Sequence, residues 1–169
     1  DNILVKIQLL GLYGLFGQLT TASVLFDDFP NPDLSSCKVM IRWYFMNDKY
    51  ADVIGFFNCF RKTVNIFDNV VFSIVLKACS GLHDFVEGRK VHCHIVKVGN
   101  ADSFVLTGLV DMYAKCGEVE SSCEVFEGIA QGNVVCWTLM VVGYMHNGCA
   151  EEALVLFNRL RDGVVKGNE

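Results

Sequence analysis

The chain has 169 residues, and its 52% hydrophobic content is enough for a packed core and excludes a disordered chain. The formal net charge of −5 argues against wholesale attraction to nucleic acid, so any site for a polyanion has to be local. No uninterrupted apolar run approaches the roughly 18 residues that a membrane helix needs. We therefore expect a soluble chain, and its start at Asp1 without a methionine or a leader suggests a fragment.

Eight cysteines are scattered along the chain rather than grouped in a compact framework. Disulfide scaffolds are typical of short secreted chains with closely spaced cysteines. Cys79, Cys116 and Cys123 fall where an apolar helix face requires a small residue, a common role for a reduced thiol. We expect buried free thiols and a reducing compartment.

The first predicted unit, residues 3–33, resembles a segment one hundred residues further along the chain. It ends in FPNPD, whose prolines and aspartate close one helix and open the next turn. Similarity at a fixed period is the sequence signature of repeat architectures. The identical pairs at this offset include Leu9 with Leu109, Tyr13 with Tyr113, Gly17 with Gly117, Phe26 with Phe126, Tyr44 with Tyr144 and Phe57 with Phe157.

The second and third predicted units are residues 34–68 and 69–102. The second is the least regular, because Trp43 stands where Gly143 stands in its partner at the hundred-residue offset. Phe67 likewise occupies a position where a turn residue would be easier to explain. The third unit is more regular and reads VVFSIVLKACSGL followed by FVEGRKVHCHIVKVGN, two segments with helical spacing.

The fourth unit, residues 103–133, is the clearest helical hairpin. Its first helix has apolar residues at i, i+3, i+4 and i+7, which share one face of a helix. Gly117 then ends that helix, because glycine takes the left-handed conformation at little steric cost. The residues of the two apolar faces are Leu106, Leu109, Val110 and Tyr113, followed by Val119, Cys123 and Phe126.

The fifth unit, residues 134–168, repeats the two-helix pattern, with Glu151 and Glu152 favouring the start of its second helix and Arg159 and Arg161 favouring the end. A unit of two short helices cannot bury its apolar face alone, so neighbouring units have to stack. We predict an all-α fold in which the five units form one continuous α-solenoid.

Three segments resemble the pentatricopeptide repeat family. VLKACSGL with GRKVHCHIVKVG, TGLVDMYAKCGEVESSCEVFEGI and VVCWTLMVVGYMHNGCAEEALVLFNRLRDG are similar to the long, short and ordinary repeats of the plant subclass that cycles through these types. The resemblance covers essentially the whole chain. It assigns short repeats to residues 3–33 and 103–133, ordinary repeats to 34–68 (degenerate) and 134–168, and a long repeat to 69–102.

The resemblance implies both a fold and a function. Members of the family are right-handed superhelices of helical hairpins that bind single-stranded RNA, with about one base for each repeat. The fifth and last residues of a repeat hydrogen-bond the base edge, and the second residue lies against the base. Such readout is chemically reasonable, because unstacked bases expose their edges. The chain would then be part of a plant organelle RNA-processing factor, acting in editing, splicing or stability in a mitochondrion or chloroplast, with other RNA-processing factors as further partners.

The resemblance assigns these roles most completely to the repeats that begin at Ser103 and Val134. A threonine and asparagine pair resembles the adenosine-selecting combination of the family, so two consecutive adenosines are expected beneath these repeats. The base-edge residues there are Thr107, Asn133, Thr138 and Asn168, and the base-sandwiching residues are Phe104 and Val135.

The first three repeats match the family pattern less well. Long repeats follow it poorly, Lys38 replaces the usual asparagine, threonine or serine, Ser35 lacks the apolar sandwich, and Ile7 cannot hydrogen-bond a base. The bases beneath these repeats stay open. Their weaker base-edge candidates are Lys38, Asp68, Ser73, Asp102 and Asp33, and their base-sandwiching candidates are Val70 and Leu4.

Each of these positions also has a simpler interpretation. Thr107 and Thr138 could be polar residues near helix starts, but base reading is favoured because the fifth and last positions both fit in two successive units. Asn133 and Asn168 could be turn or capping residues, a role that is compatible with base reading. Lys115 either neutralises a phosphate or is a solvated lysine that offsets a helix C-terminus. The alternative function is a protein-binding scaffold of the tetratricopeptide kind, whose groove would hold a peptide.

Motifs for other chemistry are weak or absent. His92 and His94 are two residues apart, so on a helix they point in different directions and chelate a metal poorly. The sequence contains no CxxC, GxSxG, GxGxxG or GxxxxGK[ST] motif. We therefore expect no metal, no cofactor and no enzymatic activity.

Overall fold

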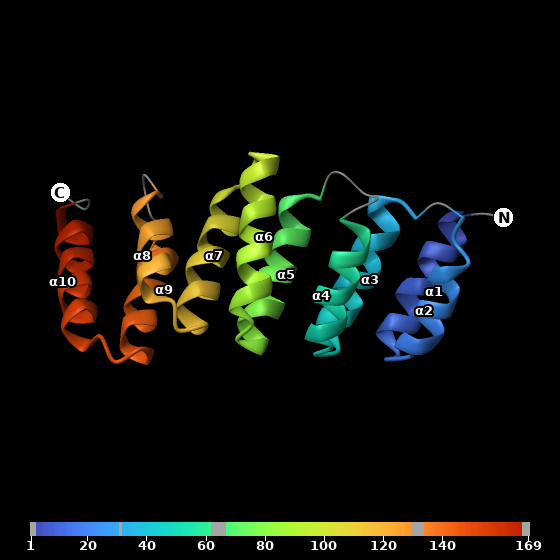
Figure 1. Ribbon diagram of the computed structural model, residues 1–169, viewed down its shortest axis with the longest axis horizontal. Helices are drawn as coiled ribbons and strands as arrows, with labels where there is room; N and C mark the ends of the chain where they lie inside the picture. Colours follow the sequence, from blue (N-terminus) through green and yellow to red (C-terminus); the bar gives the residue numbers. More distant parts are fainter. Residues whose placement is uncertain (1–2, 31, 62–66, 130–133, 167–169) are drawn as a thin grey trace. The chain divides into compact units, whose positions relative to one another are not determined.

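The computed structural model describes residues 3–30, 32–61, 67–129 and 134–166, with side chains up to Arg161 in the last helix. Within these ranges it contains ten α-helices and no β-strand, so the predicted all-α fold is confirmed (Figure 1). The helices are α1 (Ile3–Leu15), α2 (Leu19–Asp27), α3 (Leu34–Met46), α4 (Tyr50–Phe60), α5 (Asn69–Leu82), α6 (Phe85–Val98), α7 (Ser103–Lys115), α8 (Val119–Glu127), α9 (Val134–His146) and α10 (Ala150–Lys166).

The chain forms two compact units, residues 1–78 and residues 79–169. In the first unit α1 pairs with α2 and α3 with α4, and α3 packs against both helices of the preceding hairpin. In the second unit α7 pairs with α8 and α9 with α10, α9 packs against α7 and α8, and α6 lies beside α7. Each unit is thus a stack of antiparallel helical hairpins, which is the architecture of an α-solenoid.

The first helix of every hairpin ends in the same kind of turn. One residue takes a left-handed conformation, and the next residue donates its N–H to the carbonyl five residues before it, as in a Schellman motif. These bonds run from Gln18 to Tyr13, Lys49 to Tyr44, Asp84 to Cys79, Glu118 to Tyr113 and Cys149 to Tyr144, at 2.8 to 3.0 Å. The left-handed residues are Gly17, Asp48, His83, Gly117 and Gly148, with φ between 53° and 86°.

Asp48 occupies the left-handed turn position that glycine holds at Gly148 one hundred residues later, with φ of 56° and 77° respectively. A side chain in this conformation costs about 1 kcal/mol, although aspartate tolerates it better than most residues. We expect Asp48→Gly to raise the free energy of unfolding by about 0.5–1 kcal/mol and Gly148→Asp to lower it by a similar amount. Urea denaturation followed by circular dichroism measures both changes, and a destabilised Asp48→Gly variant would contradict this account.

Phenylalanines form the core at the end of the first unit. Phe57 is fully buried, with its ring 5.0 Å from that of Phe67 and 6.3 Å from that of Phe72. Phe67 is only 2% exposed. Its presence where a turn residue was expected is therefore explained by packing, because it closes the apolar interface between α4 and the first turn of α5.

Trp43 is accommodated by a glycine on the neighbouring hairpin. A Cβ atom added to Gly14 of α1 would lie 2.1 Å from the Trp43 Cγ atom, so the indole packs directly on the α1 backbone. In the second unit the sizes are exchanged, because Ala114 of α7 faces Gly143 of α9 at 2.7 Å from an added Cβ. The irregularity noted in the sequence at Trp43 is thus one half of a compensated pair.

Neighbouring hairpins are also linked by hydrogen bonds at a constant spacing. A tyrosine hydroxyl bonds to the side chain 21 residues before it, which is Ser23 for Tyr44 (2.6 Å), His92 for Tyr113 (2.8 Å) and Cys123 for Tyr144 (3.3 Å). The asparagine that follows the first helix of a hairpin donates to the preceding hairpin as well. Asn47 Nδ2 reaches Gly14 O at 3.3 Å, and Asn147 Nδ2 reaches Ala114 O at 2.9 Å.

All eight cysteines are free thiols in the structure. Cys37, Cys79 and Cys136 are buried, and burial raises the pKa of the Cys79 thiol to about 12. Cys116, Cys123 and Cys149 are half-buried. The expectation of burial is wrong for Cys59 of α4 and Cys93 of α6, whose side chains are exposed.

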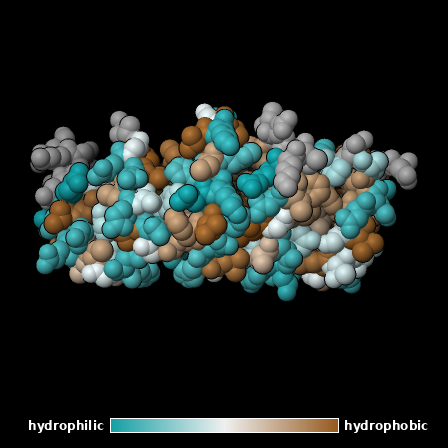
Figure 2. Space-filling model, viewed as in Figure 1, coloured by the Kyte–Doolittle hydropathy of each residue, from teal (hydrophilic) through white to brown (hydrophobic). Residues whose placement is uncertain are grey.

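The burial of equivalent positions differs between α1 and α7. Leu9 and Leu12 are exposed, whereas Leu109 and Met112, one hundred residues later, are fully buried. The difference follows from the neighbours, since α6 packs against α7 while no described helix precedes α1. Exposed apolar side chains appear as brown patches among hydrophilic ones in Figure 2. None of the described helices is long and apolar enough to cross a membrane.

Candidate nucleic-acid interface

Large apolar side chains are exposed at the second residue of four helices. Leu4, Val70, Phe104 and Val135 are 67%, 60%, 77% and 59% exposed, and each follows the first residue of α1, α5, α7 or α9. The corresponding residue of α3 is the exposed Ser35. Exposing an apolar side chain at the same position of successive hairpins leaves a repeated contact for a flat apolar partner such as a base.

The fifth residue of α7 and of α9 is a threonine with the same hydrogen bond. Thr107 Oγ1 donates to Ser103 O, and Thr138 Oγ1 donates to Val134 O, both at 2.7 Å. Phe104 and Thr107 are three residues apart, so they share one face of α7. Because the hydroxyl proton is used by the backbone, a ligand would meet these oxygens as hydrogen-bond acceptors. The Thr107 side chain also hydrogen-bonds Cys136.

The last residues of the predicted repeats 3–33, 34–68 and 69–102 are helix N-caps. Asp33 Oδ1 accepts from Ser36 N at 2.8 Å, Asp68 Oδ1 accepts from Val71 N at 3.2 Å, and Asp102 Oδ1 accepts from Val105 N at 2.9 Å. The backbone hydrogen bond is also the main reason that the pKa of Asp33 is lowered. Asn133 and Asn168, the last residues of the predicted repeats 103–133 and 134–168, lie outside the described residues.

In the predicted repeat 34–68, the fifth and last residues contact each other. Lys38 Nζ forms an ion pair with Asp68 Oδ2, and both side chains are about one-third exposed. The structure therefore brings this predicted pair of residues together. Each charge neutralises the other, so neither group is presented to a ligand as an isolated charge. Ser73, the fifth residue of α5, is half-buried, and Ile7 of α1 packs against the first core.

Lys115 belongs to a small polar cluster at the end of α7. Its ammonium group lies 2.9 Å from Asp111 Oδ2, which also accepts from Ser80 Oγ at 3.5 Å. The Lys115 carbonyl lies 2.6 Å from His83 Nδ1. Asp111 was not among the predicted site residues, although its spacing of four residues from Lys115 is a recognisable signal for a helix ion pair.

His92 of α6 is held by a tyrosine of α7. His92 Nδ1 lies 2.8 Å from the Tyr113 hydroxyl, and burial lowers the pKa of its imidazole. Across the described residues, no group of three histidine, cysteine or acidic side chains is placed to hold a metal ion.

Comparison with known proteins bears on this arrangement directly. The family model described as PPR repeat matches residues 104–133 and 135–163. A mitochondrial pentatricopeptide repeat-containing protein of Arabidopsis thaliana is 47% identical over 168 residues, which is 99% of this chain and 24% of that protein. The chain belongs to the pentatricopeptide repeat family. A chloroplastic member from the same plant, DOT4, is 32% identical over 90% of the chain and 18% of its own length.

Solved structures of the family show the same fold. The maize pentatricopeptide repeat protein PPR10 covers 94% of this chain with a TM-score of 0.67 at 18% identity, and 24% of the PPR10 chain is covered. PPR10 in complex with an 18-nt psaJ RNA element gives a TM-score of 0.71 over 92% of this chain, at 17% identity and again with 24% of PPR10 covered. This pentatricopeptide repeat chain spans about a quarter of the length of these relatives.

Proposed function

We propose that the chain binds single-stranded RNA and that each hairpin contacts about one base. The observation that carries this proposal is the repeated pairing of an exposed apolar residue with a hydroxyl one turn later, Phe104 with Thr107 and Val135 with Thr138. The apolar side chain offers a surface on which a base can stack, and the threonine oxygen offers a hydrogen-bond partner for the base edge. The complex of PPR10 with RNA supports the same conclusion for a chain of this fold.

The hairpins α7–α8 and α9–α10 are proposed to prefer adenosine. In each, the threonine is combined in the sequence with an asparagine at the last position, Asn133 or Asn168. An amide side chain both donates and accepts, as does the edge of adenine, so an amide and a hydroxyl together match that edge. Asp33, Asp68 and Asp102 show that the last position is compatible with helix capping.

The remaining hairpins are proposed to contribute less to base selection. In α3 the ion pair between Lys38 and Asp68 has to open before either side chain binds a base. Ile7 of α1 has no polar group, and Ser73 of α5 is combined with an aspartate that caps α7. Lys115 is proposed to approach a phosphate, with its charge reduced by Asp111. A chain with two selective hairpins binds RNA weakly, and we assign it no catalytic step.

The chain is further proposed to be part of a plant organelle RNA-processing factor, acting in editing, splicing or stability. Its relatives include proteins named as mitochondrial and as chloroplastic, which supports either organelle. The spacing of the left-handed turn residues, from Gly17 through Asp48, His83 and Gly117 to Gly148, alternates in the manner of the plant subclass with short, ordinary and long repeats. We propose the same repeat types for residues 3–33, 34–68, 69–102, 103–133 and 134–168.

Exchange of the base-edge pair of one repeat tests this proposal. Thr107→Asn combined with Asn133→Asp replaces the proposed adenosine-selecting pair with one that resembles the uridine-selecting pair of the family. We expect the preferred base beneath this repeat to change from adenosine to uridine, by about tenfold in relative affinity, because one or two hydrogen bonds of about 1 kcal/mol are exchanged. Fluorescence anisotropy with single-stranded oligonucleotides that differ at one base measures the change.

Thr21→Asn on α2 is the matched control, because Thr21 is exposed on the second helix of a hairpin. It should leave base preference unaltered. A preference that stays with adenosine in the double variant would show that modular readout at this repeat is wrong. A salt titration adds a second readout, since phosphate contacts make affinity fall as salt rises, whereas a peptide-binding scaffold would not follow RNA sequence.

A further inference from the structure

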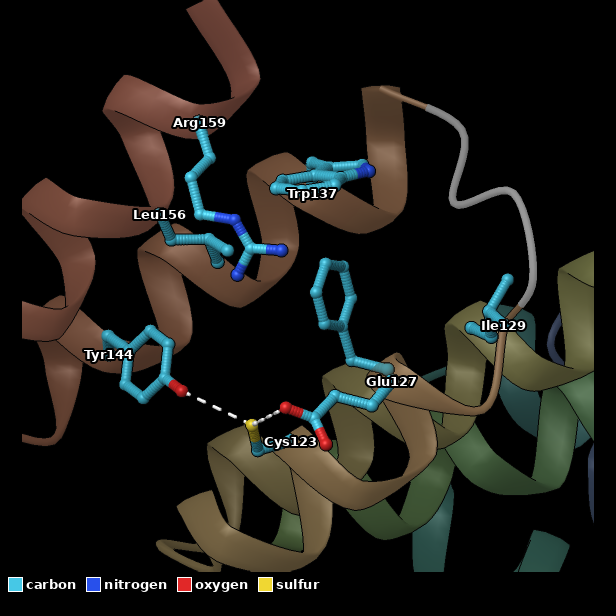
Figure 3. Close-up of a pocket in the computed structure, with 8 residues that line it drawn as sticks. Cys123, Glu127, Ile129, Trp137, Tyr144, Leu156 and Arg159 are labelled. Atoms are coloured by element: carbon cyan, nitrogen blue, oxygen red, sulfur yellow. Dashed lines mark hydrogen bonds between the residues drawn. The ribbon is translucent and has the colours of Figure 1, made fainter. Parts of the chain in front are cut away.

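A cavity of about 380 Å³ lies between the hairpins α7–α8 and α9–α10 of the second unit. Its apolar wall is made by Phe126 and Ile129 at the end of α8, Trp137 of α9 and Leu156 of α10. Figure 3 shows Arg159 extending from α10 beside Leu156, with Cys123 and Glu127 across the pocket from them and the Tyr144 hydroxyl directed toward Cys123. The cavity is thus open to a ligand from outside.

The equivalent place in the first unit is filled with aromatic rings. Phe26, the counterpart of Phe126, packs against Phe56 at 5.1 Å, Phe60 at 5.3 Å and Phe29 at 5.6 Å between ring centroids. One hundred residues later these three positions are aliphatic, while Trp137 replaces the small Cys37 and restores one ring. The second unit therefore has fewer rings around Phe126, and the internal comparison identifies the missing group as an aromatic side chain. The aliphatic replacements are Leu156, Leu160 and Ile129.

Carboxylates outnumber cations when this cavity is taken together with the one beside it. A second cavity of about 330 Å³ shares Tyr144, Leu156 and Arg159 with the first, and it is lined by Glu151 and Glu152. The two cavities together are lined by three carboxylates, those of Glu127, Glu151 and Glu152, and by one guanidinium, that of Arg159. That guanidinium lies over the Trp137 ring, with 5.6 Å between its carbon and the ring centroid. The net negative charge disfavours a phosphate and favours a cationic partner.

The cavity lies away from the proposed RNA-contacting face. Trp137 and Tyr144 are seven residues apart and share one face of α9, while Val135 lies about 160° around the helix from Trp137. A ligand in the cavity and a base on Val135 would therefore contact opposite sides of α9. Occupation of the cavity therefore does not require RNA binding.

We propose that this cavity is a docking site for a protein segment that inserts one aromatic side chain and carries a lysine or arginine beside it. The inserted ring replaces the phenylalanine side chains that fill the first unit, with edge-to-face contact to Phe126 and Trp137. The flanking cation lies near Glu127, Glu151 or Glu152 at the rim. The occupant is a partner protein rather than RNA, because the rim repels phosphate.

The probe is a capped heptapeptide with one phenylalanine between two lysines and glycine elsewhere, titrated into the chain labelled with ¹⁵N. We expect chemical shift changes in α8, α9 and α10, with binding weakened at least about tenfold when alanine replaces phenylalanine or glutamate replaces the lysines. Leu156→Phe with Ile129→Phe recreates the filled arrangement of the first unit and should weaken binding by a similar factor without lowering the melting temperature. Glu127→Gln with Glu151→Gln should weaken peptide binding while leaving the shape of the cavity unchanged.

Leu154→Phe is the matched control, because Leu154 is exposed on α10 two residues from Leu156 and outside the cavity. It adds the same ring and should leave peptide binding unchanged. The proposal is overturned if the alanine peptide binds as well as the phenylalanine peptide, or if single-stranded RNA displaces the peptide from these residues. It is also overturned if the double phenylalanine variant is folded and still binds, or if a second copy of the chain occupies the cavity in sedimentation experiments.

Discussion

Phe57→Ala is expected to lower the free energy of unfolding by about 3–5 kcal/mol, which is the usual cost of removing a large core side chain. Phe57 is fully buried and contacts the rings of both Phe67 and Phe72. Truncation removes these contacts and leaves a cavity that α4 and α5 cannot easily close. Chemical denaturation monitored by circular dichroism measures the loss.

The hundred-residue offset supplies the control for this substitution. Phe157 is the same residue type on α10, but it is 49% exposed. Phe157→Ala is therefore expected to cost about 1 kcal/mol or less, because little packing is lost. Equal losses for the two variants would show that the buried aromatic cluster does not stabilise the first unit.

Gly14→Ala is expected to destabilise the chain by about 1–3 kcal/mol, although alanine normally favours a helix over glycine. The reason is the Trp43 ring, because an added Cβ would lie 2.1 Å from its Cγ atom. The indole has to move away from α1, and it then loses contact with the backbone that it covers. Thermal and chemical denaturation of the single variant measure this cost.

A double-mutant cycle with Trp43→Gly separates the steric conflict from the loss of the indole. The combined change reproduces the small pair found at Ala114 and Gly143 in the second unit. In the Trp43→Gly background, Gly14→Ala should be neutral or stabilising by up to about 1 kcal/mol, because only the helix preference remains. If Gly14→Ala were equally costly in both backgrounds, contact with Trp43 would not be its cause.

The all-α fold followed from the sequence because apolar residues recur at helical spacing and glycines such as Gly17 and Gly117 mark helix ends. The turn residues Asp48 and His83 were less evident, since their left-handed conformation is set by the hydrogen bonds around it rather than by residue type. The fit of Trp43 on Gly14 was not predictable, because it joins two helices and depends on their distance of approach.

The candidate site was predictable as positions but not as interactions. The exposure of Phe104 and Val135 agrees with a ligand-contacting role. The ion pair between Lys38 and Asp68 was not predictable, because the two residues are thirty positions apart in the chain. Helix capping was offered as an alternative role for Asn133 and Asn168, the last residues of their repeats. The structure shows capping at the same position of three other repeats, by Asp33, Asp68 and Asp102. The cavity between the hairpins α7–α8 and α9–α10 was not predictable from the sequence, because it results from smaller side chains at Leu156 and Ile129.

The N-caps at Asp33, Asp68 and Asp102 limit which residue types are tolerated at the position that follows each hairpin. A side chain there has to begin the next helix, and short polar residues such as aspartate, asparagine, serine and threonine do this best. Long side chains such as lysine, arginine or glutamine would reach a ligand but lose about 1 kcal/mol of helix capping. The set of residues available for recognition at this position is thus restricted by folding before any ligand binds.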